Sequence, residues 1–420
     1  MPDRGSACSR RGEATSRRAM SENAKIHENP NRAGRVVRLF RTALSAYQSA
    51  AVLGCTTLIL LVALNAMLSL AFRVKDAFFP EINPDAAAYH ERLRGVYPGM
   101  SLDEIRELMA ETWQRRIVYD PFTQFREGPF TGKYVNVHAA GFRIGLDQGP
   151  WPPAEGDLRI FMFGGSTLFG YGVRDEDTIA SHLQRYLRER LGPKVSVYNF
   201  GQGAYFSAQE RALWEQLLLA GRGHDRAIFI DGLNEFAQLD GEPAWTQTLR
   251  DFVAQQTNDW SQRWVSRTAL ARFVFGVRNR LGIAGEAGDR SGDGAAAQPV
   301  DPALIEAVCE RYLRNKRLIE AVAAAYGISC VFVWQPIPTY QYEPSRHPFM
   351  PKNPSPPLRH APRGYAWMAA RRGDPRLGGN FLWLADLQND QPGPLYVDQV
   401  HYNAAFSKTL AEAIGAWLLR

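Results

Sequence analysis

The longest apolar stretch of the chain lies near its N-terminus. Residues 42–72 lie between Arg41 and Arg73, carry no charged side chain, and are mostly apolar from Ala50 to Phe72. Because a helix needs about 20 apolar residues to cross the hydrocarbon core of a bilayer, residues 42–72 predict one transmembrane helix. A buried helix of a soluble domain is the alternative, but such a helix normally carries a polar face. A cleaved signal peptide fits less well, because its apolar region is about 7–15 residues long and its charged leader is short.

From residue 157 onward, short apolar runs alternate with amphipathic segments. Four runs predict strands, at residues 158–163, 194–200, 227–230 and 328–334. The first, LRIFMF, is continuous, as expected for a strand covered on both faces. The amphipathic segments predict helices, at residues 177–191, 207–220, 302–326 and 404–419. Strands that alternate with helices predict an α/β fold, in which a parallel sheet is covered by helices on both faces as a three-layer sandwich.

A connecting region and two insertions surround this pattern. Ser101 and Glu104 form a capping-box motif that opens a short helix ending near Trp113, and Ser207 with Glu210 forms a second such motif. We predict four parts: a tail of residues 1–41, a transmembrane helix of residues 42–72, a connecting region of residues 73–150, and a domain of residues 151–420 with insertions at about 236–300 and 337–380.

The net charge of +6 comes from the N-terminal tail. Residues 1–46 contain ten basic and four acidic residues, so the rest of the chain is neutral. A nucleic-acid-binding domain would carry its positive charge on its folded surface, so we expect no nucleic-acid partner. The basic residues before the apolar stretch place the N-terminus in the cytoplasm and the body outside, as a single-pass protein of a bacterial-type inner membrane. Either Met1 or Met20 is the true start, because residues 1–19 have the composition of an unstructured leader.

Several common chemistries lack their motifs. The sequence has no HExxH and no CxxC, and its eight histidines do not cluster, so we expect no metal. No G-x-G-x-x-G follows the first predicted strand, so we expect no dinucleotide and no other cofactor. The G-x-S-x-G elbow of α/β-hydrolases is also absent. Cys309 and Cys330 lie too far apart along a helix and the following strand to pair, so two buried thiols are expected.

Polar residues that could perform acyl transfer follow the predicted strands. Ligands of a parallel sheet bind beyond the carboxyl ends of its strands, where these loops lie. The loops are Gly164-Gly165-Ser166-Thr167, Asn199-Phe-Gly-Gln-Gly-Ala-Tyr205, Asp231-Gly-Leu-Asn-Glu235 and, near the C-terminus, Asp398-Gln-Val-His401. They supply a serine, backbone N–H groups, a side-chain amide and an Asp/His pair, which suffice for chemistry through a covalent serine ester. Each loop alone is an ordinary turn or helix start, and their combination and order make the prediction.

The four blocks resemble those of the SGNH (GDSL-like) hydrolases, whose name gives the Ser, Gly, Asn and His found here in that order. The resemblance covers about residues 157–235 and 325–420, and implies a flavodoxin-like α/β/α sandwich. It implies that Ser166 is the nucleophile, His401 its base and Asp398 the orienting acid. It also implies an oxyanion hole, formed by the backbone N–H of Ser166, a backbone N–H at Gly203 or Ala204, and the side chain of Asn234.

The sequence departs from the family pattern at two positions. The glycine of the second block aligns best with Ala204, which should cost little unless that residue needs a positive φ. The third block usually ends in Asp, whereas this chain has Glu235, for which the resemblance implies a structural role.

We therefore expect a membrane-anchored serine esterase that acts on an acylated envelope carbohydrate or lipid. One alternative is an O-acyltransferase that modifies an exopolysaccharide with the same triad, because the family resemblance includes anchored proteins that work beside a membrane-embedded acyltransferase. A second alternative is a non-catalytic scaffold of a polysaccharide assembly complex. In the second insertion, Arg346, Lys352, Arg359 and Arg363 suggest a basic lid that attracts an anionic substrate.

Overall fold

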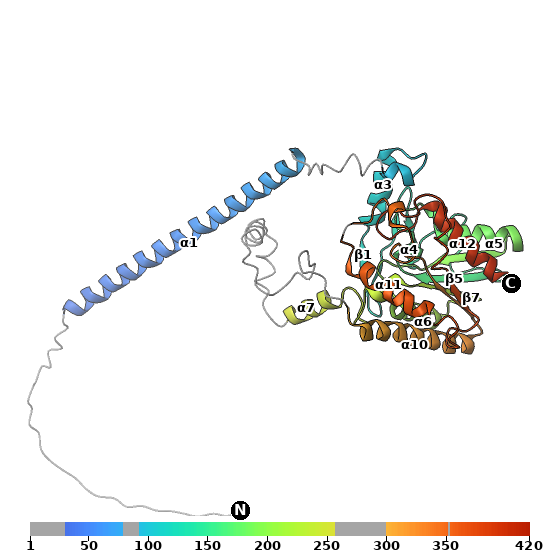
Figure 1. Ribbon diagram of the computed structural model, residues 1–420. Helices are drawn as coiled ribbons and strands as arrows, with labels where there is room; N and C mark the ends of the chain where they lie inside the picture. Colours follow the sequence, from blue (N-terminus) through green and yellow to red (C-terminus); the bar gives the residue numbers. More distant parts are fainter. Residues whose placement is uncertain (1–29, 79–91, 257–299, 352) are drawn as a thin grey trace, which may run out of the picture. The chain divides into compact units, whose positions relative to one another are not determined.

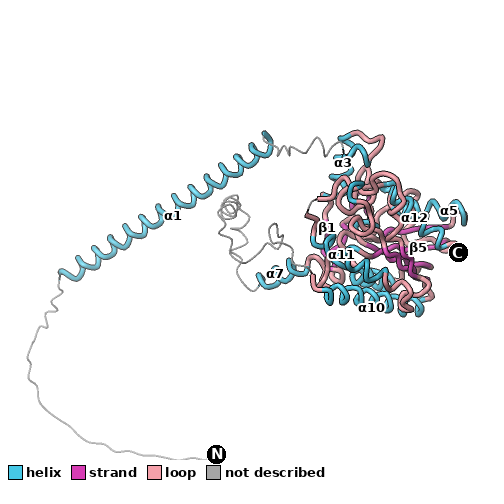
Figure 2. The backbone as a smooth tube through the Cα atoms, in the orientation of Figure 1, coloured by secondary structure: helices cyan, strands magenta, loops and turns pink. Residues whose placement is uncertain are grey.

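The computed structural model describes residues 30–78, 92–256, 300–351 and 353–420 of the 420-residue chain (Figures 1 and 2). The described residues form two compact units: one contains the N-terminal helix, and the other contains all remaining described residues. The helices are α1 (Pro30–Phe78), α3 (Leu102–Trp113), α4 (Ser166–Phe169), α5 (Ile179–Leu191), α6 (Ser207–Leu219), α7 (Thr246–Gln256), α10 (Pro302–Tyr326), α11 (Pro356–Ala369) and α12 (Ala404–Leu418). Short 3-10 turns are η1 (Asp175–Asp177), η2 (Leu233–Phe236) and η3 (Pro344–Arg346).

The N-terminal unit is dominated by α1. Its segment Gly34–Ser69 is long and apolar enough to cross a membrane, by length and composition. Apolar side chains along it, such as Leu58 and Ile59, are exposed and are not covered by other described parts of the protein. This helix contains residues 42–72, where the sequence predicts the transmembrane segment.

A five-stranded parallel sheet forms the centre of the second unit. Its strands are β5 (Leu158–Gly164), β6 (Val195–Asn199), β7 (Arg226–Asp231), β8 (Ser329–Trp334) and β9 (Phe381–Trp383). They lie in the order β6-β5-β7-β8-β9, and every neighbouring pair is parallel. The predicted α/β class and all four predicted strands are confirmed, while the sequence pattern missed β9, which has only three residues.

Helices cover both faces of this sheet, as Figure 1 shows for α5 and α12 on one face and α6 and α10 on the other. Along β5, Ile160 and Met162 point into the apolar core under α5 and α12. Phe161 and Phe163 point into the opposite core with Trp214 of α6. This two-sided burial explains the continuous apolar run in the sequence.

The helix ends test the two predicted capping boxes. The Ser101–Glu104 box is confirmed at the start of α3, with both reciprocal hydrogen bonds present. The box predicted at Ser207 and Glu210 is wrong, because the N-cap residue of α6 is Phe206, and the backbone N–H of Ser207 donates to Glu235 instead of pairing with Glu210. Ser207 and Glu210 are instead buried, and Glu210 faces two other carboxyl groups described below. The predicted buried thiols are confirmed, since Cys309 and Cys330 are buried and unpaired.

The connecting region packs against the sheet domain. It contains α3 and two antiparallel pairs, formed by β1 (Ile117–Asp120) with β2 (Gln124–Glu127) and by β3 (Phe130–Thr131) with β4 (Asn136–Val137). Leu108 of α3 and Val135 share a core cluster with Phe169 of α4 and Val397. Residues upstream of the sheet therefore lie close to the carboxyl ends of its strands.

Candidate active site

Ser166 lies where β5 ends and α4 begins. It is the first residue of α4, and Gly165 is the N-cap residue. A Cβ atom built on Gly165 would lie 2.3 Å from Asn234 Nδ2, so only glycine fits this close approach between the loops after β5 and β7. The loops that carry Ser166 and Asn234 therefore lie against each other.

The structure brings Ser166, His401 and Asp398 into one hydrogen-bonded series. His401 Nε2 lies 2.8 Å from Ser166 Oγ, and His401 Nδ1 lies 2.7 Å from Asp398 Oδ2. The other oxygen of Asp398 accepts hydrogen bonds of 2.9 Å from the backbone N–H groups of Val400 and His401. These bonds fix the carboxylate, which in turn fixes the orientation of the imidazole ring.

The surroundings of Asp398 keep it ionised. Its burial opposes ionisation, but the charge of His401 and the hydrogen bonds from His401 and Val400 outweigh burial and lower the pKa of Asp398 below its usual value. A carboxylate at this position can accept the Nδ1–H of His401 and leave Nε2 free to accept a proton from Ser166.

Candidate donors for an oxyanion come from three loops. Asn234 Nδ2 donates one hydrogen bond to Tyr205 O at 2.6 Å, and its amide group has a second N–H. Among the described residues, the backbone N–H groups of Ser166, Gly203 and Ala204 have no hydrogen-bond acceptor within the protein. These groups are therefore available to a ligand at the carboxyl edge of the sheet.

Ala204 adopts a left-handed backbone conformation with φ of 61°. This conformation places Cβ close to the following carbonyl oxygen and costs an L-residue about 1–2 kcal/mol. Residue 204 therefore does need a positive φ, and alanine is strained at this position where glycine would not be.

Glu235 lies in a buried cluster with Glu210 and Asp231. Glu235 Oε1 accepts a hydrogen bond of 2.7 Å from the backbone N–H of Ser207, and its other oxygen lies 3.7 Å from Arg311 Nη2. Burial, followed by the charges of Asp231 and Glu235, raises the pKa of Glu210 well above its usual value. Burial and the charge of Glu235 likewise raise the pKa of Asp231. The cluster lies at the start of α6 and at the end of β7, directly beneath the Asn234 turn.

Two aromatic residues beside His401 were missed in the sequence. Tyr171 stacks on the imidazole, with ring centroids 5.2 Å apart and 24° between the planes. Trp113 lies edge-to-face with both rings, at 4.9 Å from Tyr171 and 5.4 Å from His401. Because Trp113 ends a helix of the connecting region, no pattern near the nucleophile could have indicated it.

A buried carboxylate of the connecting region fixes Tyr171. Tyr171 donates its hydroxyl hydrogen to Glu127 Oε1 at 2.6 Å, and Arg115 Nη2 lies 3.1 Å from Glu127 Oε2. Burial, then the charge and hydrogen bond of Glu127, raise the pKa of Tyr171, so the hydroxyl stays protonated and donates. The backbone N–H of Glu127 also donates to Gln202 Oε1 at 2.7 Å, which ties β2 to the loop that carries Gly203.

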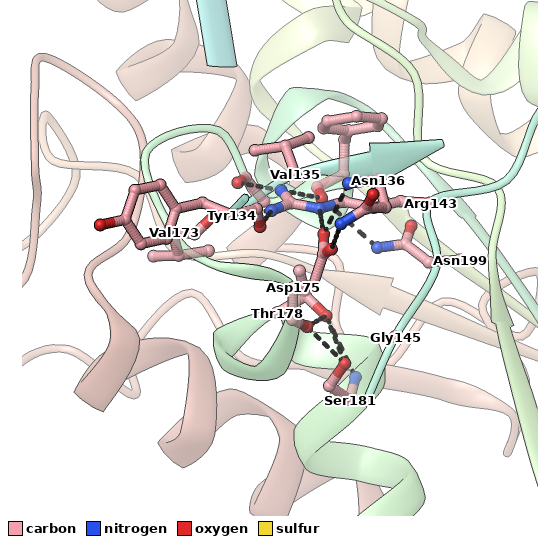
Figure 3. A network of polar contacts seen from close by, with 12 residues as sticks. Tyr134, Val135, Asn136, Arg143, Gly145, Val173, Asp175, Thr178, Ser181 and Asn199 are labelled. Atoms are coloured by element: carbon pink, nitrogen blue, oxygen red, sulfur yellow. Dashed lines mark hydrogen bonds and ion pairs between the residues drawn. The ribbon is translucent and has the colours of Figure 1, made fainter. Parts of the chain in front are cut away.

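Arg143 contacts the C-terminal end of α4, and Figure 3 shows its guanidinium beside Asp175 and Val173. Its buried guanidinium donates to the carbonyl oxygens of Phe169, Gly170 and Val173, at 3.0, 2.5 and 2.7 Å. The same group pairs with Asp175 Oδ1 at 2.8 Å. Arg143 thus satisfies the last carbonyl group of α4 and two carbonyl groups that follow the helix, while Leu168 O accepts a hydrogen bond of 2.9 Å from Asn199 Nδ2.

Three basic residues of the second insertion donate hydrogen bonds to backbone carbonyl groups, and two of them, Arg359 and Arg363, lie one turn apart on α11. Arg346 donates to Asn389 O, Arg359 to Pro354 O and Arg363 to Val300 O, at 3.3, 3.1 and 2.9 Å. Lys352 lies outside the described residues. These contacts give the hypothesis of a basic lid no structural support.

Within the described ranges, no group of three His, Cys, Asp or Glu side chains could hold a metal ion.

Comparison with solved structures finds lipolytic proteins and esterases that resemble this chain. No protein-family model and no curated protein matches the sequence. One structural neighbour is a protein of the G-D-S-L lipolytic family from Desulfitobacterium hafniense, with 12% identity, 62% of this chain and 99% of that chain covered, and a TM-score of 0.32.

Two further neighbours are carbohydrate esterases. The acetylxylan esterase Axe2 from Geobacillus stearothermophilus shares 11% identity, with 65% and 96% coverage and a TM-score of 0.34. Est24, a carbohydrate acetylesterase from Sinorhizobium meliloti, shares 9% identity, with 63% and 99% coverage and a TM-score of 0.33. At such identities and TM-scores, we infer function from the geometry of the site.

Proposed function

We propose that this chain is a membrane-anchored serine esterase of the SGNH type that acts on an acylated envelope carbohydrate or lipid. One observation carries the proposal: Ser166 Oγ, His401 and Asp398 are joined by hydrogen bonds of 2.8 and 2.7 Å at the carboxyl edge of a parallel sheet. Nucleophile, base and orienting acid are within reach of one another without any rearrangement.

In the first half of the proposed reaction, Ser166 Oγ attacks the carbonyl carbon of the ester while His401 Nε2 accepts its proton. The carbonyl oxygen gains negative charge, which the N–H groups of Ser166, Gly203 or Ala204 and Asn234 stabilise. His401 then returns the proton to the alcohol oxygen of the ester. The C–O bond breaks, the alcohol leaves, and the acyl group remains on Ser166.

In the second half, an acceptor hydroxyl replaces the departed alcohol. His401 removes a proton from it, the acceptor oxygen attacks the acyl carbon, and Ser166 leaves with the proton that His401 returns. Water as acceptor gives an esterase, and a sugar hydroxyl as acceptor gives the acyltransferase alternative. The protein groups that act are the same in both cases.

Full-length protein in detergent can test the serine chemistry. We expect the parent to hydrolyse p-nitrophenyl acetate and to be labelled by a fluorophosphonate at Ser166. Ser166→Ala should lose both, with turnover reduced about 10⁴-fold or more, and the exposed Ser345→Ala should behave as the parent. A Ser166→Ala variant that retains more than about a tenth of parental turnover would refute the assignment. Adding an acetylated donor with and without a sugar acceptor then separates transfer from hydrolysis.

The anchoring part of the proposal is supported by α1 and by the basic residues that precede its apolar segment. A reporter enzyme that works only outside the cytoplasm, fused after Arg420, should be active. Protease added from that side should release the body from the membrane fraction. An inactive reporter together with a protected body would place the body in the cytoplasm and contradict this topology.

A further inference from the structure

We infer that Trp113 recognises the alcohol part of the substrate by stacking its indole on a pyranose ring of an acylated carbohydrate. The inference rests on the proposed function and narrows its substrate class from carbohydrate or lipid to carbohydrate. It assigns a binding role to the connecting region, which lies outside the four sequence blocks.

Trp113 is held in place but not covered. Its ring centroid lies 4.9 Å from that of Tyr171 and 5.4 Å from that of His401, at angles of 90° and 73°. Even so, 52% of its surface is exposed. A rigid aromatic side chain that is already oriented loses little conformational freedom on binding, and covering its free surface removes apolar area from water.

The position of Trp113 relative to His401 selects the part of the ester that it meets. In the proposed reaction His401 Nε2 returns the proton to the alcohol oxygen, so this oxygen must lie within hydrogen-bond reach of Nε2. The acyl carbonyl oxygen instead faces the N–H donors of the Gly203 and Asn234 loops. A group attached to the alcohol oxygen therefore lies on the His401 side of the site, where the indole is.

The half-exposed indole suits a sugar ring better than an alkyl chain. A pyranose presents a face of C–H groups that can cover one aromatic ring, while its hydroxyl groups stay at the rim in water. Gln114 follows Trp113 directly and Arg116 lies three positions after it; both side chains are exposed and carry N–H donors for such hydroxyl groups. An alkyl chain would use none of these donors.

Three kinds of acetate ester test the inference on full-length protein in detergent. The first is a set of mono-O-acetylated methyl glucoside, galactoside and mannoside, the second is octyl acetate and the third is ethyl acetate. Trp113→Ala should lower kcat/KM for at least one pyranoside acetate about tenfold more than it lowers kcat/KM for ethyl acetate and octyl acetate, and the additional loss should come mainly through KM. Trp113→Phe should retain most of the activity on the pyranoside. The matched control is Tyr326→Ala, because Tyr326 is 57% exposed and lies just before β8, at the opposite edge of the sheet.

Each other outcome overturns the inference. Equal losses on all three esters would mean that Trp113 only positions His401, and equal losses on the pyranoside and octyl esters would mean a general apolar surface. Unchanged rates on the pyranosides, or a parent that prefers ethyl acetate to all of them, would remove the sugar contact. A parent that hydrolyses p-nitrophenyl acetate but none of these esters would overturn the inference alone, whereas a parent inactive on p-nitrophenyl acetate as well would refute the proposed function and the inference with it.

Discussion

The imidazole of His401 lies flat against the phenol ring of Tyr171, with 5.2 Å between the ring centroids. Tyr171 is itself fixed by the carboxylate of Glu127, to which it donates a hydrogen bond of 2.6 Å. The proposed base is therefore supported by Asp398 through its Nδ1 atom and by Tyr171 across its ring face. These two supports can be removed separately.

Tyr171→Phe should keep the ring and lose the hydroxyl. The buried Glu127 Oε1 would then lack its donor, at a cost of about 1–3 kcal/mol in unfolding free energy, while turnover should fall less than about tenfold. Tyr171→Ala should lower turnover further, because the imidazole loses its stacking partner. Thermal unfolding and esterase rates measured on both variants check this. Equal losses of turnover in the two variants would show that the hydroxyl, and not the ring, supports His401.

His401→Ala should reduce turnover more than Asp398→Asn does. The histidine accepts the proton, whereas the aspartate orients and stabilises the imidazole, so we expect losses of about 10⁴-fold or more for the first and a smaller loss for the second. Rates on p-nitrophenyl acetate give the comparison, with fluorophosphonate labelling as a second readout. Full activity of both variants, or a defect confined to Asp398→Asn, would contradict the assigned roles.

Asn234→Ala should lower kcat by roughly 10²-fold with little change in KM, because an oxyanion donor acts mainly in the transition state. Asn234→Asp is the matched variant, since it keeps the shape of the side chain and removes the amide N–H. We expect similar losses from both, measured as full saturation curves. A change confined to KM would make Asn234 a substrate-binding residue instead.

Ala204→Gly should stabilise the protein by up to about 1 kcal/mol, because it removes the strain of a φ of 61°. The greater conformational entropy of glycine in the unfolded chain offsets part of this gain. Turnover should not fall, because the backbone N–H is kept. Gly203→Ala should instead destabilise the protein, because its Cβ would lie 2.5 Å from the hydroxyl oxygen of Tyr171. Melting temperature and turnover of both variants test the pair, and a destabilised Ala204→Gly would contradict the strain at this position.

Glu210→Gln should make the protein less sensitive to rising pH. Burial raises the pKa of Glu210 above its usual 4.5 in the folded state only. Above pH 4.5 the unfolded chain releases this proton and the folded protein keeps it, so stability falls as pH rises, by up to about 1.4 kcal/mol per pH unit until the raised pKa is passed. The gain of Glu210→Gln over the parent should therefore grow from pH 4.5 upward.

Melting temperatures between about pH 4.5 and pH 8 measure this difference. The control is Glu215→Gln on the same helix, whose side chain is 33% exposed and pairs with Arg211. Parallel pH curves for Glu210→Gln and the parent would show that Glu210 is not protonated in the folded protein.

The sheet, and the meeting of the loops that follow its strands at one edge, could be predicted from the sequence because both depend on local patterns. Buried parallel strands are continuous apolar runs, and residues that follow such strands meet at one edge, which brought together Ser166, Asn234 and His401. Strand β9 escaped prediction because three residues carry no periodic signal. The capping box predicted at Ser207 and Glu210 was wrong for a different reason. The residue types that cap helices can also be buried, and Glu210 belongs to a buried carboxyl cluster.

The surroundings of the triad could not be predicted, because they come from distant residues. Tyr171 meets Glu127, 44 positions away, and Gln202 meets Glu127 across 75 positions. Nothing in the local sequence of Trp113 or Arg115 distinguishes them from other residues at the end of an amphipathic helix. Only the packing of the connecting region on the sheet domain brings Trp113 against His401 and Arg115 against Tyr171.

Ser166 and His401 are 235 positions apart, and every strand of the five-stranded sheet is synthesised before residue 398. A growing chain therefore carries the serine hydroxyl long before it carries the group that would activate it. Fragments that end before Asp398, whether from arrested translation or from proteolysis, would lack the base even if their sheet had formed. Under the proposed function, activity would begin only after the ribosome has released nearly the whole chain, so a nascent copy could not attack esters in the compartment where it is made.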